Sequence, residues 1–139
     1  MDRLLEYINR HPFLVSLAVA ILLAVIAFEL RTRRMGFAAL PPQDAIRLMN
    51  QGAAVYDLRD AAAFAAGHIG NAKNLVADQH DKAADVLKKY REKFLVLYCE
   101  DGSASAALAR KLHAAGFTKT FNLRGGLSTW RADGLPLVR

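Results

Sequence analysis

The feature that most constrains this chain is an apolar run near its N-terminus. Residues 13–28 contain no charged side chain and only one polar one, Ser16. The segment Pro12–Leu30 has 19 residues. As a helix rising 1.5 Å per residue it would be about 28 Å long, which matches the hydrocarbon core of a bilayer. We therefore predict a transmembrane helix over residues 12–30.

Two other interpretations of this run are less favoured. A buried core helix of this length is rarely apolar on every face. A cleaved signal peptide needs small residues soon after the apolar run. Here Arg31, Arg33 and Arg34 come first, and the nearest small-x-small triplet lies at 36–38. An anchor that stays attached to the chain is the favoured interpretation.

The flanks of the predicted span set the domain boundaries. Residues 1–11 form an N-terminal flank, 31–36 a basic linker, and 37–139 a domain of ordinary soluble composition. Three arginines follow the span closely, whereas only Arg3 and Arg10 precede it. Because positive charge is retained on the cytoplasmic side, this bias favours a cytoplasmic C-terminal domain.

Charge and cysteine content exclude several classes of function. The chain has a formal net charge of +6 and one cysteine. A single cysteine excludes an intrachain disulfide and a multi-cysteine zinc site. The basic cluster 88–93 is typical of a solvated helix end, and no long basic stripe is present, so nucleic-acid binding has no support. A mildly basic domain beside a membrane can gain from anionic lipids.

Beyond residue 36 the pattern alternates between short apolar runs and helical periodicity. This alternation predicts a parallel sheet covered by helices on both faces. The predicted strands are 37–40, 53–58, 72–76, 94–98 and 118–123. The predicted helices are 43–50, 60–66, 78–90, 103–115 and 127–132.

Cys99 directly follows the clearest of these strands. Residues 100–102 cannot continue a buried strand, and the next helix begins near Ser103. Ligands of parallel α/β sheets bind at the carboxyl ends of the strands. A short loop that curls into a helix N-terminus points backbone N–H groups inward, which favours an anion and would favour the thiolate of Cys99. Ser103 and Ser105 could add hydroxyl donors.

The alternative interpretation is an inert buried cysteine at the end of a core strand. Cysteine is among the residue types that are most often buried. Spacing alone leaves the reactive and the inert interpretation open.

Four separated motifs then give the chain a resemblance to a known family. The first is Tyr56-Asp57-Leu58-Arg59, an Asp-x-Arg strand end. The second runs from Phe64 to Asn74 and fits F-x-x-G-H-I-x-x-A-x-N. The third, Cys99 to Ser105, fits C-x-x-G-x-x-S. The fourth is Gly125-Gly126 with Trp130, followed by Gly134-Leu135-Pro136. Together they resemble the single-domain rhodanese-like sulfurtransferases, and with the N-terminal helix the membrane-anchored forms of Gram-negative bacteria.

The resemblance implies an α/β fold with a five-stranded parallel sheet flanked by helices. It implies that Cys99 accepts a sulfane sulfur as a persulfide and passes it to a thiophilic acceptor, without metal or organic cofactor. It also implies a single-pass protein of the bacterial inner membrane. The expected substrate-binding residues are Glu100, Asp101, Gly102, Ser103, Ala104, Ser105 and Arg59.

The cysteine loop departs from the family pattern in its charge. Rhodaneses with high activity often carry Arg or Lys in this loop, where the chain has Glu100 and Asp101. Carboxylates oppose thiolate formation and repel an anionic donor such as thiosulfate. The related phosphatases place an arginine where the chain has Ser105, so phosphatase activity is not expected. The second hypothesis is a catalytically weak domain that docks a membrane-protein partner.

Overall fold

The computed structural model describes residues 1–35 and 38–139. Gly36 and Phe37, which end the predicted linker and begin the predicted domain, lie outside the described residues. The chain divides into two compact units, Met1–Arg33 and Arg34–Arg139. We describe each unit by itself.

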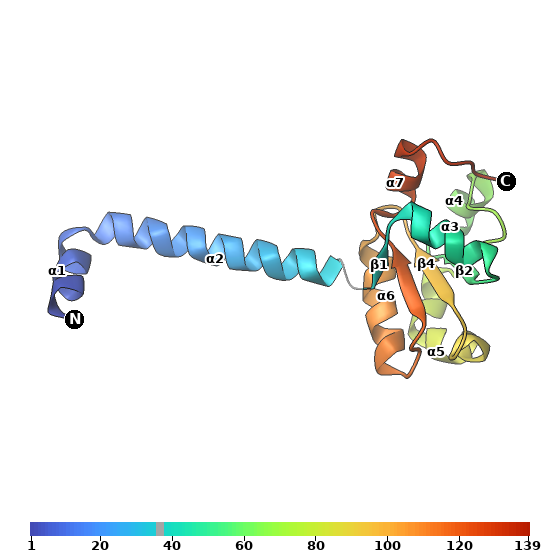
Figure 1. Ribbon diagram of the computed structural model, residues 1–139, viewed down its shortest axis with the longest axis horizontal. Coiled ribbons are helices and arrows are strands. Elements are labelled where there is room, and N and C mark those ends of the chain that lie inside the picture. Colours follow the sequence, from blue (N-terminus) through green and yellow to red (C-terminus); the bar gives the residue numbers. More distant parts are fainter. Residues whose placement is uncertain (36–37) are drawn as a thin grey trace. The chain divides into compact units, whose positions relative to one another are not determined.

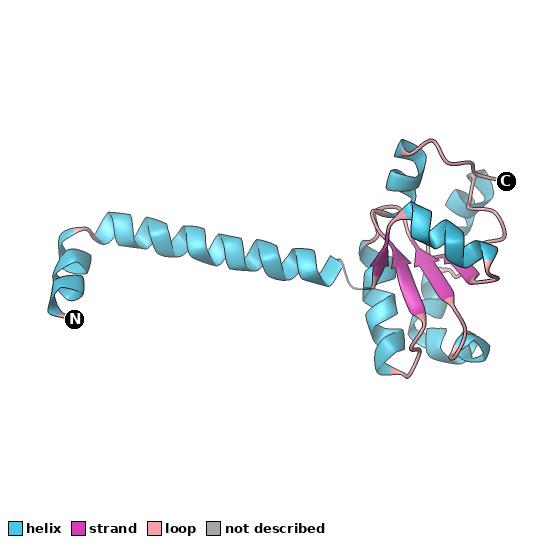
Figure 2. Cartoon of the chain, viewed as in Figure 1, coloured by secondary structure: helices cyan, strands magenta, loops and turns pink. Residues whose placement is uncertain are grey.

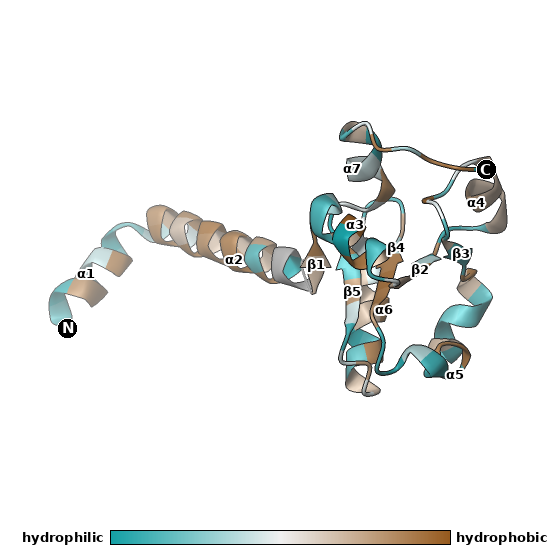
Figure 3. Cartoon of the chain, turned by 45° about the vertical axis from the view of Figure 1, so that its right-hand side comes forward, coloured by the Kyte–Doolittle hydropathy of each residue, from teal (hydrophilic) through white to brown (hydrophobic). Residues whose placement is uncertain are grey.

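The N-terminal unit consists of two helices, α1 (Asp2–Arg10) and α2 (Pro12–Met35). In the part of the chain that the structure describes, one helix is long and apolar enough to cross a membrane, over Pro12–Arg31. Most of this helix is coloured as hydrophobic in Figure 3. The helix continues beyond Leu30, the predicted end of the span. Its length and composition fit a membrane anchor or a signal sequence.

The C-terminal unit contains the predicted five-stranded parallel sheet (Figure 2). Its strands are β1 (Ala39–Leu40), β2 (Ala54–Asp57), β3 (Lys73–Asn74), β4 (Leu95–Tyr98) and β5 (Thr120–Leu123). They lie in the order β1-β5-β4-β2-β3, and every pair is parallel. Each strand is shorter than predicted, because a strand ends where its neighbour no longer pairs with it. The edge strand β3, for example, pairs with β2 at only two positions.

The central strand β4 divides two hydrophobic cores. Its four residues are fully buried, which explains the continuous apolar run in the sequence. Leu95, Leu97 and Cys99 face a core shared with α5 (Ala83–Val86) and α6 (Ser103–Ala114). Val96 and Tyr98 face a second core, shared with α3 (Pro42–Asn50) and α7 (Gly126–Ala132). This two-residue alternation places the Cys99 side chain on the α6 side of the sheet.

Of two helices predicted between β2 and β4, one is present and the other is wrong. The predicted helix 60–66 is present as α4 (Ala61–Ala66), capped by the Asp60 side chain, which accepts a hydrogen bond from the Ala63 amide at 2.7 Å. The continuous helix predicted over 78–90 is wrong. The structure has η1 (Ala77–Lys82), α5 and η2 (Lys88–Tyr90) instead. Only Ala83 and Leu87 are fully buried in this stretch, so packing stabilises little more than one turn of regular helix.

Candidate active site

The candidate nucleophile Cys99 lies one residue beyond β4 and at the start of a tight loop into α6. The residue is 6% exposed. Gly102 adopts a left-handed conformation (φ 89°) immediately before α6. This turn brings the Gly102 amide back to the sulfur, to which it donates a hydrogen bond at 3.1 Å. The loop therefore supplies one backbone donor to the Cys99 sulfur.

Two further polar groups approach the Cys99 sulfur. The Ser105 hydroxyl lies 3.5 Å from it, and the thiol donates a long hydrogen bond of 3.7 Å to Asp101 Oδ1. The sequence predicted several inward-pointing amides. Of the described residues, only Gly102 has an amide bonded to the sulfur. The Ser103 amide bonds instead to Asp101 Oδ1, at 2.9 Å, so the carboxylate takes a donor that the thiolate was expected to use.

Asp101 is held in its charged form by its neighbours. Its Oδ1 atom accepts the Ser103 hydroxyl at 2.6 Å in addition to the Ser103 amide. These hydrogen bonds, the hydroxyl first, lower the pKa of Asp101 below its ordinary value. The thiol of Cys99 therefore has a carboxylate as its hydrogen-bond acceptor.

The lowered pKa of Asp101 predicts a loss of stability in acid. Because the folded pKa lies below the unfolded one, Asp101 contributes stability above about pH 4, and this is lost as the pH falls through the folded value. We expect the free energy of unfolding in urea to fall less between pH 5 and pH 3 in Asp101→Asn than in the wild type. Asp85→Asn changes an exposed carboxylate and serves as the control. The prediction would be contradicted if the free energy of unfolding changed equally with pH in Asp101→Asn and Asp85→Asn.

Glu100 is paired with two arginines. Its Oε1 atom accepts from Arg131 Nη1 at 2.5 Å, and its Oε2 atom lies 3.6 Å from Arg59 Nη1. The carboxylate thus links the cysteine loop to the end of β2 and to α7. Its charge is compensated locally, so of the two loop carboxylates Asp101 is the one that acts on the sulfur directly.

Arg59 is principally a partner of Asp57. Its Nε and Nη2 atoms bond to the two carboxylate oxygens of Asp57 at 2.7–3.1 Å, and Nη2 also donates to the Gly67 carbonyl at 2.6 Å. The Arg59 side chain is 8% exposed and the Asp57 side chain 0%. Burial alone would lower the pKa of Arg59, but the hydrogen bonds and charge of Asp57 outweigh it and raise the pKa. Only Nη1 points toward the cysteine loop, at Glu100.

The first turn of α7 is hydrogen-bonded to the cysteine loop. The amides of Leu127 and Ser128 donate to the carbonyls of Cys99 and Glu100 at 2.9 and 3.0 Å. This approach depends on Gly126, which has a positive φ of 60°. A Cβ atom there would lie 2.4 Å from the Cys99 carbonyl oxygen and 2.7 Å from the Gly102 nitrogen. The Gly-Gly motif therefore builds the backbone of the site.

Sequence reasoning missed two residues of this site. Arg131 lies on α7 and pairs with Glu100, but its position in sequence gives no sign of that contact. Asn122 lies in β5, fully buried, and accepts a hydrogen bond from the Ser105 hydroxyl. Its Nδ2 atom is one of two buried side-chain polar atoms without a partner among the described residues. A polar side chain inside the last core strand was a signal that could have indicated Asn122.

The other motif residues have structural roles. The His68 ring stacks on Phe64 at 3.9 Å, and its Nδ1 atom is 2.9 Å from the Phe64 carbonyl. Trp130 is buried, and its Nε1 atom donates to the Pro136 carbonyl at 3.0 Å. Both residues therefore make their contacts within the domain and not with the cysteine loop.

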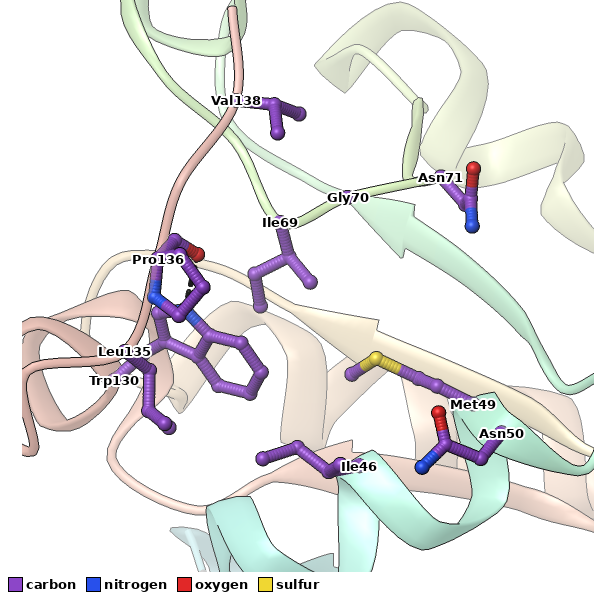
Figure 4. A pocket seen from close by; sticks show the side chains of 10 residues that line it. All are labelled: Ile46, Met49, Asn50, Ile69, Gly70, Asn71, Trp130, Leu135, Pro136 and Val138. Carbon is purple, nitrogen blue, oxygen red and sulfur yellow. Dashed lines mark hydrogen bonds between the residues drawn. The ribbon is translucent and has the colours of Figure 1, made fainter.

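The structure also has a pocket away from the cysteine loop (Figure 4). It has a volume of about 330 Å³ and lies between α3, residues 69–71 and the C-terminal segment. Ile46, Met49 and Trp130 contribute apolar side chains to its wall. None of its lining residues belongs to the loop 99–105. Among the described residues no group of three or more His, Cys, Asp or Glu side chains could hold a metal ion.

Comparison with known proteins agrees with this geometry. The model of the rhodanese-like domain matches residues 41–133. The protein YibN of Escherichia coli (strain K12) is 32% identical over 142 residues, covering 100% of this chain and 99% of YibN. The thiosulfate sulfurtransferase GlpE of Pseudomonas putida (strain GB-1) is 38% identical over 97 residues, covering 69% of this chain and 86% of GlpE.

A solved structure extends the similarity to the fold. The rhodanese-related protein of Thermoplasma volcanium superimposes with a TM-score of 0.65 at 24% identity, covering 73% of this chain and 98% of that one. The matched family model spans most of the chain and includes Cys99, its loop and the Gly-Gly turn that supports it. The chain belongs to the rhodanese-like family.

Proposed function

We propose that this protein is a membrane-tethered sulfurtransferase that carries sulfane sulfur as a persulfide on Cys99. The observation that carries the proposal is the Cys99 sulfur at the carboxyl end of β4, with the Gly102 amide donating to it at 3.1 Å. Family relatives named thiosulfate sulfurtransferase support an enzyme of this class.

The reaction proceeds by two displacements at sulfur. The Cys99 thiolate attacks the outer sulfur of a donor such as thiosulfate. The donor S–S bond breaks, sulfite leaves with the electron pair, and Cys99 becomes a persulfide. A thiolate acceptor then attacks the outer sulfur of that persulfide and releases the Cys99 thiolate. No net oxidation occurs, because one S–S bond forms for each that breaks.

The loop residues 100–105 and Arg59 form the proposed donor site. The Gly102 amide stabilises negative charge on the sulfur, both in the thiolate and in the persulfide anion. The Ser105 hydroxyl lies 3.5 Å from the sulfur and can donate to a charged sulfur by turning its single hydrogen away from Asn122 Oδ1. Asp101 accepts the thiol hydrogen before reaction, at 3.7 Å. The balance between these groups sets the reactivity of Cys99.

Mass spectrometry of the intact protein tests the proposal. The full chain in detergent is incubated with thiosulfate or with a polysulfide, and peptides are then mapped. We expect a mass gain of one sulfur atom on the peptide that contains Cys99, removed again by a thiol acceptor. Absence of the adduct with both donors would overturn the proposal.

The charge of Glu100 should affect how well this site accepts an anionic sulfur donor. Its carboxylate neutralises Arg131 and contacts Arg59, so Glu100→Gln frees positive charge beside the loop. We expect kcat/KM for the dianion thiosulfate to rise by about threefold to tenfold at low salt, and the gain to shrink as salt is added. A steady-state assay at two ionic strengths measures both effects.

Glu92→Gln is the matched control for this prediction. It makes the same change in net charge at an exposed residue before β4. An equal rise in both variants would indicate a general effect of protein charge. A fall in Glu100→Gln alone would mean that the carboxylate acts as a brace for the loop, and the prediction would be wrong.

We further propose that the domain lies at the cytoplasmic face of the bacterial inner membrane. The apolar span Pro12–Arg31 and the arginines after it support this arrangement. Protease added outside spheroplasts should leave the C-terminal domain intact and should cleave it after lysis. Digestion before lysis would reverse the topology, and release of the protein by alkaline carbonate would exclude a spanning helix.

A domain that docks a membrane-protein partner is the second candidate. The buried Cys99 thiol and its contact with Asp101 favour low reactivity. Crosslinking in intact membranes distinguishes the two functions. Capture of one partner by both the wild type and Cys99→Ser, without any persulfide adduct, would support docking. A persulfide adduct together with full transfer activity of the purified chain would support the enzyme.

A further inference from the structure

The first helix, α1, has two chemically different faces. At 100° per residue, Leu4, Leu5 and Ile8 fall within an arc of about 100°. Charged side chains, including Glu6 and Arg10, occupy the opposite side. Leu4, Leu5 and Ile8 are 69%, 60% and 38% exposed, and α1 has no buried residue. The apolar face of α1 is therefore not covered by the described part of the chain.

The position of α1 in the chain indicates what covers this face. The helix ends at Arg10. The backbone of the next residue, His11, is not helical (φ −131°, ψ 57°), and α2 begins directly after it at Pro12. Pro12 is also the first residue of the candidate membrane span. A span that begins there places His11 and Arg10 at the level of the lipid headgroups. The break at His11 lets α1 leave the direction of α2 (Figure 1).

The composition of α1 suits the boundary between headgroups and acyl chains. The Tyr7 and His11 rings lie 4.8 Å apart, and tyrosine favours this boundary. On the polar face, Arg10 pairs with Glu6 at 3.5 Å. The four charged side chains of α1, two acidic and two basic, sum to zero. Attachment would therefore depend on apolar burial more than on anionic lipids.

We propose that α1 is an interfacial helix that lies in the plane of the bilayer with Leu4, Leu5 and Ile8 buried in lipid. The proposal rests on the membrane tether and adds a second, differently oriented contact with the same bilayer. A membrane-spanning helix that is held at one end only can shift in depth and rotate about its axis in the membrane. A helix lying on the surface at its N-terminal end fixes the depth of Pro12 and limits the rotation of α2.

Site-directed spin labelling of the full chain tests this inference. Cys99→Ser removes the one native thiol, and a nitroxide is attached to a cysteine introduced at a single position. Leu5→Cys and Ile8→Cys report on the apolar face, Glu6→Cys on the polar face, and Ala20→Cys on the middle of the span. The protein is inserted into phosphatidylcholine vesicles. Collisions with oxygen, which partitions into lipid, are compared with collisions with a water-soluble nickel chelate.

We expect the oxygen-to-nickel ratio at residues 5 and 8 to exceed the ratio at residue 6 by at least about threefold, and residue 20 to be fully shielded from nickel. Equal ratios at 5, 6 and 8 with residue 20 shielded would overturn the interfacial helix and leave the tether intact. Nickel access at residue 20 would overturn both. Dipolar broadening between Ile8→Cys labels would show that a second copy of the chain covers the face, and would also overturn the proposal.

Discussion

Replacement of Cys99 by serine should abolish sulfur transfer. A serine hydroxyl cannot form a persulfide, and its oxygen is a far weaker nucleophile toward sulfane sulfur than a thiolate. We expect kcat with thiosulfate or a polysulfide to fall by at least about 10³-fold, with no sulfur adduct on the chain. Serine is polar and slightly smaller, and the Gly102 amide and Ser105 hydroxyl that surround the Cys99 sulfur remain available to it. The free energy of unfolding should change by under about 2 kcal/mol.

A displaced thiol separates the position of Cys99 from its chemistry. Ala104 lies in the first turn of α6 and is exposed, so Cys99→Ser combined with Ala104→Cys restores a thiol without the Gly102 and Ser105 contacts. We expect the double variant to be alkylated freely but to transfer sulfur much more slowly than the wild type. If the double variant recovered the wild-type rate, the loop contacts at the carboxyl end of β4 would not be what makes Cys99 reactive.

The fold could be predicted from the sequence because the strongest sequence patterns reflect which residues are buried. The continuous apolar run before Cys99 predicts a strand buried on both faces, and β4 has that environment. The helix predicted over 78–90 failed for a related reason. Apolar periodicity in that stretch was present, but the sheet offers a buried surface only to Ala83 and Leu87. Periodicity shows which face can be buried, whereas tertiary packing decides how many turns are regular.

The candidate site was predictable in its centre and not in its periphery. Cys99 and its loop follow from a strand, a tight turn and a helix that are contiguous in sequence. Arg131 and Asn122 reach the loop from segments more than 15 residues away, as the contacts with Glu100 and Ser105 show. Long-range pairs of this kind leave no periodic signal. The number of backbone amides that donate to the sulfur was likewise unpredictable. It depends on whether the Ser103 amide bonds to Asp101 or to Cys99.

The second large effect is expected at Gly126, far from the sulfur in sequence. Gly126→Ala would place a Cβ atom 2.4 Å from the Cys99 carbonyl oxygen and 2.7 Å from the Glu100 carbonyl oxygen, both backbone atoms that cannot rotate away. Its φ of 60° also disfavours any side chain. We expect a loss of about 3 kcal/mol or more in the free energy of unfolding, and at least about a tenfold fall in transfer rate in the fraction that folds.

Two matched glycines separate the causes of this effect. Gly52 has a positive φ of 92° but nothing within 4 Å of an added Cβ, so Gly52→Ala measures conformational strain alone, at about 1 kcal/mol. Gly70 has neither a positive φ nor a near neighbour, and Gly70→Ala should be close to neutral. Urea unfolding and thiosulfate turnover of the three variants form one series. If Gly126→Ala lost no more stability than Gly52→Ala and kept full turnover, the close approach of the β5–α7 turn to the cysteine loop would not be needed to shape the site. If stability fell as expected but turnover in the folded fraction did not, the turn would support the domain without setting the geometry around Cys99.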